Sequence, residues 1–71
     1  MQNVRFAEYI DLVEAFGFHL VHIRGSHYIY RHPEVDEPLN IQPFKGEAKA
    51  YQIRQFLELI ELYDLNLDEN N

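Results

Sequence analysis

Apolar residues recur at helical spacing near both ends of the chain. Between Val4 and Phe16 this spacing predicts a helix whose buried face carries Phe6, Tyr9, Ile10, Leu12, Val13 and Phe16. We expect Asn3 to cap the start of this helix and Gly17 to end it in a left-handed conformation. A second helix is predicted from about Ala50 to Tyr63, with a buried face formed by Ile53, Phe56, Leu57, Ile60 and Tyr63.

The pattern changes to period two between residues 18 and 32, which predicts two strands. Gly25-Ser26 separates them and predicts a two-residue hairpin turn with glycine at the first central position. Such a turn places Arg24 opposite His27, so that both side chains share a face of the sheet. We expect one face of the hairpin to join the core through Val21, Ile23, Tyr28 and Tyr30. The other face is expected to point outward and to be cationic, with His22, Arg24, His27 and Arg31 beside Leu20 and Ile29.

A third antiparallel strand is predicted from Leu39 to Phe44, after an acidic connection and before a loop at Lys45-Gly46-Glu47. The fold class is therefore α+β in the order α-β-β-β-α. Its three-stranded antiparallel sheet has both helices packed on one face, as in double-stranded RNA-binding domains. We expect residues 1–71 to form a single domain, with a frayed tail from Asp68 to Asn71.

Composition narrows the class of protein. The 71 residues include no cysteine, and the net charge of −6 argues against strong general affinity for nucleic acid. The charge is unevenly distributed, however, because residues 17–33 contain no acid but hold two arginines and all four histidines. The start of the chain has no apolar core of a signal peptide, and no apolar run is long enough to span a membrane. We expect a soluble, cytoplasmic protein.

The cationic face has the residue types that RNA cleavage requires. RNA is cut when its own 2′-hydroxyl attacks the neighbouring phosphate, which needs proton transfers at two oxygens and positive charge at the phosphate. Histidine suits the proton transfers and arginine the charge. His27, beside a glycine turn and opposite Arg24, fits this role, and His22 or Lys45 are alternatives for the second transfer. From spacing alone, the simpler interpretation of His27 as a solvated strand residue is favoured.

A metal site built from the histidines is not expected. His19 and His22 should point to opposite faces of their strand, because they differ by an odd number of positions. His22 and His27 would be diagonal neighbours, about 7–8 Å apart at the backbone. No cysteine or nearby carboxylate completes a ligand set, so we expect neither a metal nor another cofactor.

The segment from Gly17 to Pro33 (GFHLVHIRGSHYIYRHP) resembles the central signature of the HicA toxin family. This signature is a helix ending in Gly-Phe, a strand, a Gly-Ser-His turn and an aromatic strand that ends near Arg-His-Pro. The resemblance extends from about Phe6 to Ile60. It implies an endoribonuclease (mRNA interferase) that cleaves messenger RNA, has His27 as its catalytic residue and is held inactive by a HicB-type antitoxin. The RNA-binding residues expected around His27 are His22, Arg24, Gly25, Ser26, Arg31 and Lys45.

Two other functions stay open. A non-catalytic module of the same fold that binds RNA or a protein partner is favoured by the acidic balance. It is also favoured by Tyr28, which stands where many family members carry a second histidine. Phe44 favours it too, because Pro43-Phe44-Lys45 stands where many members have Pro-x-His after the third strand. A small structural subunit would show no dependence on histidine in any assay. Among the remaining surface residues, Tyr51 has a ring suited to stacking on a base, whereas Lys49 and Arg54 are interpreted as solubilising charge.

Overall fold

The computed structural model describes residues 4–68, and these form two helices and two antiparallel sheets. In chain order the elements are β1 (Val4–Arg5), α1 (Phe6–Ala15), β2 (His19–Arg24), β3 (His27–Arg31), β4 (Leu39–Ile41), β5 (Glu47–Ala48) and α2 (Ala50–Leu62). The larger sheet has the order β2-β3-β4, and a small one pairs β1 with β5. The predicted α+β class is confirmed. The three strands of the larger antiparallel sheet come after α1 and before α2 in the sequence, as expected.

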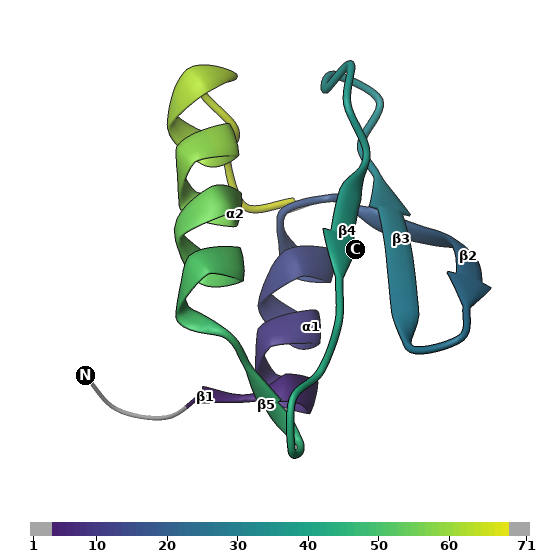
Figure 1. The fold of residues 1–71 in the computed structure, drawn as a ribbon. Coiled ribbons are helices and arrows are strands. Elements are labelled where there is room, and N and C mark those ends of the chain that lie inside the picture. The colour runs from purple at the N-terminus through teal and green to yellow at the C-terminus, as the bar shows by residue number, and fades with distance from the viewer. Residues whose placement is uncertain (1–3, 69–71) are drawn as a thin grey trace.

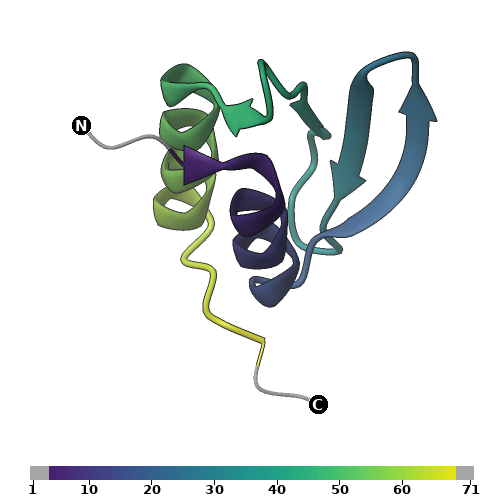
Figure 2. The ribbon, with the colours of Figure 1, turned by 90° about the horizontal axis from the view of Figure 1, so that it is seen from below.

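Both helices lie on one side of the three-stranded sheet, with α1 between the sheet and α2 (Figures 1 and 2). The core fills the space between these layers. Phe56 of α2 is at its centre, because the rings of Tyr9, Phe16 and Phe18 all contact it edge-on or tilted, at centroid distances of 5.8, 5.6 and 5.8 Å. The other buried apolar residues are Val13, Tyr30, Val35, Leu39, Ile41, Leu59 and Leu65.

Helix α1 begins at Phe6, two residues later than predicted. Val4 and Arg5 are extended instead, because they pair with Ala48 and Glu47 of β5. The expected capping residue, Asn3, lies outside the described residues. At the other end, Gly17 has the predicted left-handed backbone, with φ of +93°.

The hairpin of β2 and β3 has the expected two-residue turn, but β2 departs from regular alternation. Arg24 pairs with His27 as predicted, and Gly25 at the first central position has φ of +60°. Further from the turn, a β-bulge between Leu20 and His22 leaves Val21 as an extra residue. Leu20 consequently pairs with Tyr30 and shares its face, so Leu20 was wrongly assigned to the outward face.

The prediction of a core face on β2 was wrong, whereas that on β3 was correct. All six residues of β2 are exposed, including Val21 at 55% and Ile23 at 50%. Tyr30 is buried, and Tyr28 packs partly against the core. The reason is position, because β2 is the edge strand that lies farthest from the helices (Figure 1).

The third strand is shorter than predicted, since β4 ends at Ile41. Its Leu39 and Ile41 are fully buried, as the alternation indicated. The predicted loop after it is a tight turn from Phe44 to Glu47 that leads into β5. At the end of the chain, Asp68 was expected in a frayed tail but donates its backbone N–H to the carbonyl oxygen of Ala15 at 2.7 Å.

Candidate functional site

His27 is the first residue of β3 and comes directly after the hairpin turn. Its side chain is exposed, and Arg24 is its partner across the hairpin. Directly paired residues have Cβ atoms about 4.5–5.5 Å apart, so the guanidinium stem of Arg24 starts beside the imidazole. The left-handed Gly25 has no heavy atom within 4 Å of where a Cβ would lie, so the backbone at the turn is open to a ligand.

Asn40 of β4 fixes the orientation of the His27 ring. The Nδ1 atom of His27 lies 3.1 Å from the amide oxygen of Asn40. An amide oxygen only accepts hydrogen bonds, so this contact matches the tautomer of the neutral imidazole that carries its proton on Nδ1. In that tautomer Nε2 has a lone pair that can accept a proton. Sequence reasoning missed Asn40, although the alternation that buried Leu39 and Ile41 already placed it on the outward face.

Gln42 attaches the hairpin turn to the body of the protein. Its side-chain amide donates a hydrogen bond to the hydroxyl oxygen of Ser26 at 3.0 Å. The backbone of Gln42 is held in turn by the buried amide of Gln52 on α2, which donates to its carbonyl at 3.1 Å and accepts from its N–H at 2.9 Å. The turn that carries His27 is thus connected to α2 through two glutamines, neither of which was predicted.

The structure brings together only part of the predicted site. Arg24, Gly25, Ser26 and His27 are contiguous around the turn, and His22 lies one pair further along, opposite Ile29. Arg31 is at the far end of β3, about 13 Å along the strand from His27. Its guanidinium donates to the backbone carbonyl of Asp36 at 3.2 Å, so it stabilises the connection after β3.

The bulge also changes the relationship between the histidines. His19 pairs with Arg31 and His22 with Ile29, so both histidines lie on the same face, which corrects the expectation that they face opposite ways. Even so, within residues 4–68 no group of three or more His, Cys, Asp or Glu side chains could hold a metal ion. No helix in that range is long and apolar enough to cross a membrane.

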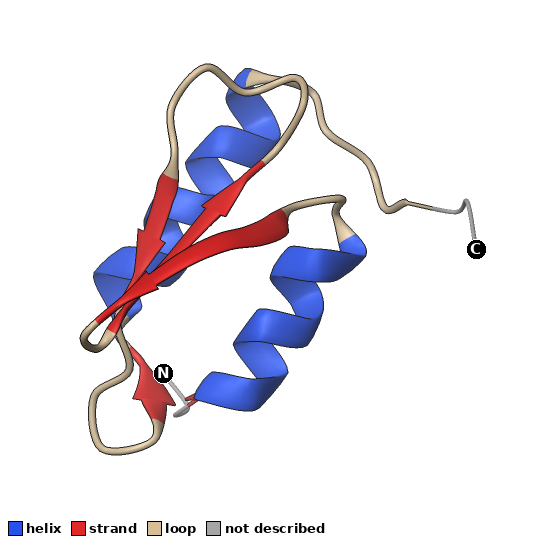
Figure 3. Ribbon diagram, turned by 90° about the vertical axis from the view of Figure 1, so that its right-hand side faces the viewer, coloured by secondary structure: helices blue, strands red, loops and turns tan. Residues whose placement is uncertain are grey.

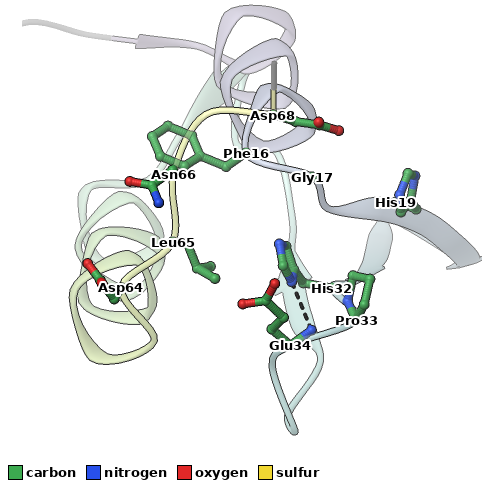
Figure 4. Close-up of a pocket in the computed structure, with 10 residues that line it drawn as sticks. All are labelled: Phe16, Gly17, His19, His32, Pro33, Glu34, Asp64, Leu65, Asn66 and Asp68. Carbon is green, nitrogen blue, oxygen red and sulfur yellow. Dashed lines mark hydrogen bonds between the residues drawn. The ribbon is translucent and has the colours of Figure 1, made fainter. Parts of the chain in front are cut away.

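A pocket of 310 Å³ lies at the other end of the hairpin from His27, between the end of α1 and the residues after α2 (Figure 4). It includes His19 and His32, but His32 has a structural role. Its Nδ1 accepts the backbone N–H of Glu34 at 3.0 Å, and its ring packs on Phe18 at a centroid distance of 5.0 Å. The two tyrosines with a raised pKa, Tyr9 and Tyr30, owe it mainly to burial and lie in the core, away from His27.

Comparison with known proteins identifies the family of the chain. The model of one protein family, described as the HicA toxin of bacterial toxin–antitoxin systems, matches residues 6–62. The match runs from the first residue of α1 to the last residue of α2 and includes the whole of the hairpin. No curated protein and no solved structure matches the chain. A family match over this much of the sequence means that the chain belongs to the HicA toxin family of bacterial toxin–antitoxin systems.

Proposed function

We propose that this toxin is a metal-independent endoribonuclease that cleaves messenger RNA with His27 as its general acid and base. One observation carries the proposal: an exposed histidine at a glycine turn has its Nδ1 held by Asn40 at 3.1 Å, which leaves Nε2 available for a proton. A solvated strand residue would not need a second strand to fix its ring. The fixed orientation supports a role in proton transfer.

The chemistry requires the RNA to supply the nucleophile. Nε2 of His27 takes the proton of a 2′-hydroxyl while the oxygen attacks the adjacent phosphorus. The bond from phosphorus to the 5′-oxygen breaks, and a protonated imidazole supplies the proton that the leaving oxygen needs. The products are a 2′,3′-cyclic phosphate and a free 5′-hydroxyl. Arg24 offsets the negative charge that develops at the phosphate, and His22 and Lys45 are the candidates for a second proton donor.

Family membership also implies an antitoxin partner. We propose that the partner is of the HicB type and that it covers the outward face of the hairpin, so that RNA cannot reach His27. This face has no acidic residue between Gly17 and Pro33, although the chain as a whole has a net charge of −6. An acidic partner surface would therefore be matched in charge to this part of the toxin.

The deciding experiment incubates a long single-stranded RNA with the parent protein, with His27→Ala and with His19→Ala, all in the presence of a chelator. His19 is the matched control because it is an exposed histidine on the same face at the other end of the hairpin. Cleavage by the parent and the His19 variant, but not by the His27 variant, is the expected result. Equal loss in both variants, or equal activity in all three, would contradict the assignment.

A second measurement tests the role of Asn40 as a positioning residue. Asn40→Leu removes the acceptor and is expected to lower the cleavage rate at every pH. Asn40→Asp keeps an oxygen that accepts from Nδ1–H, and its charge favours the imidazolium form. We therefore expect Asn40→Asp to retain cleavage but to move its pH–rate profile upward. Unchanged profiles in both variants would mean that the contact has no role in the reaction.

The second candidate is a non-catalytic module that binds RNA or protein. It is favoured because this chain lacks the second histidine that many family members carry directly after the first. Here that position is Tyr28, and its ring packs on Phe6 at a centroid distance of 5.3 Å. If the folded parent protein cuts no RNA under any condition, this candidate replaces the nuclease.

A further inference from the structure

A tight turn after β4 holds an aromatic ring in solvent. Phe44 and Glu47 exchange two backbone hydrogen bonds, at 2.9 and 3.0 Å, across Lys45 and Gly46. Both central residues have positive φ, 52° and 78°, which is the geometry of a type I′ turn. The turn is also fixed to the start of α1, because Gly46 accepts the N–H of Phe6 at 2.9 Å. Phe44 is nonetheless 53% exposed, so a rigid backbone presents its ring outward.

Two lysines and a second exposed ring surround Phe44. The ammonium groups of Lys45 and Lys49 each lie 5.4 Å from the centre of the Phe44 ring. Lys49 also lies 5.8 Å from the ring of Tyr51, which is 52% exposed. We call these four residues the aromatic–lysine cluster. It contains both lysines of residues 38–57, a stretch in which Glu47 is the single acid.

The surroundings of the cluster leave room for a ligand. An open pocket of 490 Å³ lies beside it, lined by Phe44, Glu47, Ala48, Lys49 and Ala50. Glu47 is the one acidic group in this lining, and it lies opposite Arg5 in the pairing of β1 with β5. The rings of Phe44 and Tyr51 do not belong to the hydrophobic core, since each side chain is about half exposed to solvent.

The cluster lies at the same end of the molecule as His27. The hydrogen bond from Gln42 to Ser26 joins the strand end to the hairpin turn, and Phe44 follows Gln42 by two residues. Two extended residues span about 7 Å. In Figures 1 and 3 the turn between β2 and β3 and the turn before β5 lie at the same end of the sheet. One ligand strand of a few nucleotides can therefore contact both places.

We propose that the aromatic–lysine cluster is a binding site for single-stranded RNA, with one base stacked on Phe44 or Tyr51 and the phosphates beside it on Lys45 and Lys49. Exposed rings interleaved with cations are the combination that binds single strands, because every base has a face that stacks and every nucleotide carries a charge. An apolar peptide would not use the two ammonium groups. The proposal rests on the proposed function, since it supplies the path of the RNA past His27.

A tryptophan reporter tests the stacking directly. The chain has no tryptophan, so Phe44→Trp introduces a single fluorophore at the proposed site. The experiment uses the His27→Ala background, so that the RNA stays intact, and titrates a short uridine oligomer. Saturable quenching is expected. The matched control is Leu62→Trp at the far end of α2, where the side chain is 73% exposed. Equal quenching in both variants, or none in either, would overturn the proposal.

Affinity and salt dependence separate the two kinds of contact. Phe44→Leu keeps an apolar side chain but loses the ring, and it should weaken binding of the oligomer by about 5-fold or more, because stacking contributes roughly 1–3 kcal/mol per base. Its salt dependence should not change. Lys45→Gln and Lys49→Gln should each reduce the slope of log affinity against log salt by about 0.7. Unchanged affinity of Phe44→Leu, or equally tight binding of an acidic peptide, would exclude a site for bases.

These outcomes also separate this site from the nuclease. Quenching without cleavage by the parent protein would remove the proposed nuclease activity and leave the RNA site standing. Cleavage that depends on His27, without quenching at the Phe44 position, would keep the nuclease and overturn the site. Thermal unfolding followed by circular dichroism shows that each variant is folded, as is expected for substitutions of exposed side chains.

Discussion

The two strands that flank β3 show opposite behaviour. In β4, Leu39 and Ile41 are fully buried and Asn40 is exposed, so the alternation of the sequence becomes an alternation of burial. In β2 all six residues are exposed, although its sequence is at least as apolar. Both strands are edges of the same sheet, and the difference is that the helices lie under β4 and not under β2 (Figure 2).

Strand β2 therefore forms part of the protein surface on both of its faces. Leu20, Val21 and Ile23 are exposed at 42, 55 and 50%. An exposed apolar edge strand invites pairing with another chain, and natural proteins limit this with bulges and charges. The bulge at Val21 and the cation Arg24 are such devices. They limit pairing of this edge with other chains while its side chains stay exposed.

The largest expected effect comes from a substitution in the buried strand, β4. Leu39→Ala leaves a cavity beneath β4 and should lower the free energy of unfolding by about 2–5 kcal/mol. A domain of this size has only about 5–15 kcal/mol in total, so the variant should be largely unfolded in moderate urea. Urea titration followed by circular dichroism measures this. A loss below 1 kcal/mol would mean that the sheet and helices are not closely packed at Leu39.

The next effect compares two glycines that both have positive φ. A Cβ at Gly17 would lie 3.1 Å from Nε2 of His32, whereas a Cβ at Gly25 would meet no atom within 4 Å. Backbone strain of about 1–2 kcal/mol applies to both alanine variants. Gly17→Ala should therefore lower the melting temperature more than Gly25→Ala. Equal losses would show that the His32 ring moves without cost.

A smaller effect concerns a buried phenol. The hydroxyl of Tyr9 donates to the backbone carbonyl of Gln52 at 2.9 Å, and Tyr9→Phe should cost about 1 kcal/mol. Burial raises the pKa of Tyr9 and of Tyr30 above the ordinary value of 10.0. The unfolded chain therefore releases these protons first, so stability is full below about pH 10 and falls as the pH rises above it.

The measurement for Tyr9 is the urea midpoint at pH 8, 10 and 11. The parent midpoint should fall above pH 10, because the free energy of unfolding decreases there by up to about 1.4 kcal/mol per pH unit for each buried tyrosine. The urea midpoint of Tyr9→Phe should lie below that of the parent at pH 8. It should also fall less steeply above pH 10, and Tyr30 should account for the fall that remains. Parallel pH profiles would indicate that Tyr9 ionises in the folded protein.

The smallest effect is expected from substitutions in the exposed strand, β2. Ile23→Thr replaces a half-exposed side chain on β2 by a smaller polar one that is also β-branched, and the free energy of unfolding should change by no more than about 0.5 kcal/mol. Val21→Thr is the matched variant at the bulge. If either costs as much as Leu39→Ala, then β2 is covered in solution, for instance by a second copy of the chain, and its role as open surface is wrong.

Much of the fold followed from local pattern. The helical spacing from Ala50 onward predicted α2 within one residue, and Gly25-Ser26 predicted the turn that pairs Arg24 with His27. These features depend on neighbours in the sequence. The bulge at Val21 and the start of α1 could not be predicted in this way. The bulge is a feature of the pairing between β2 and β3, and the start of α1 is set by the pairing of Val4 with Ala48.

The candidate site divides in the same manner. His27, Arg24 and the turn were predicted because they are contiguous in the hairpin. Asn40 and Gln42 were missed because their contacts with His27 and Ser26 join residues 13 and 16 positions apart. The aromatic–lysine cluster was recognised only in pieces, and Lys49 was interpreted as solubilising charge until its position between two rings was known.

The sequence by itself determined the α+β fold class, the two helices, the hairpin and the family resemblance, because periodicity and turn chemistry are properties of adjacent residues. Only the tertiary structure decided which strand is buried and which residues support His27. Burial depends on what packs against a strand, which the sequence of the strand does not show. The hydrogen bond that orients the imidazole comes from Asn40 on β4, and no local sequence pattern indicates that β4 lies beside His27.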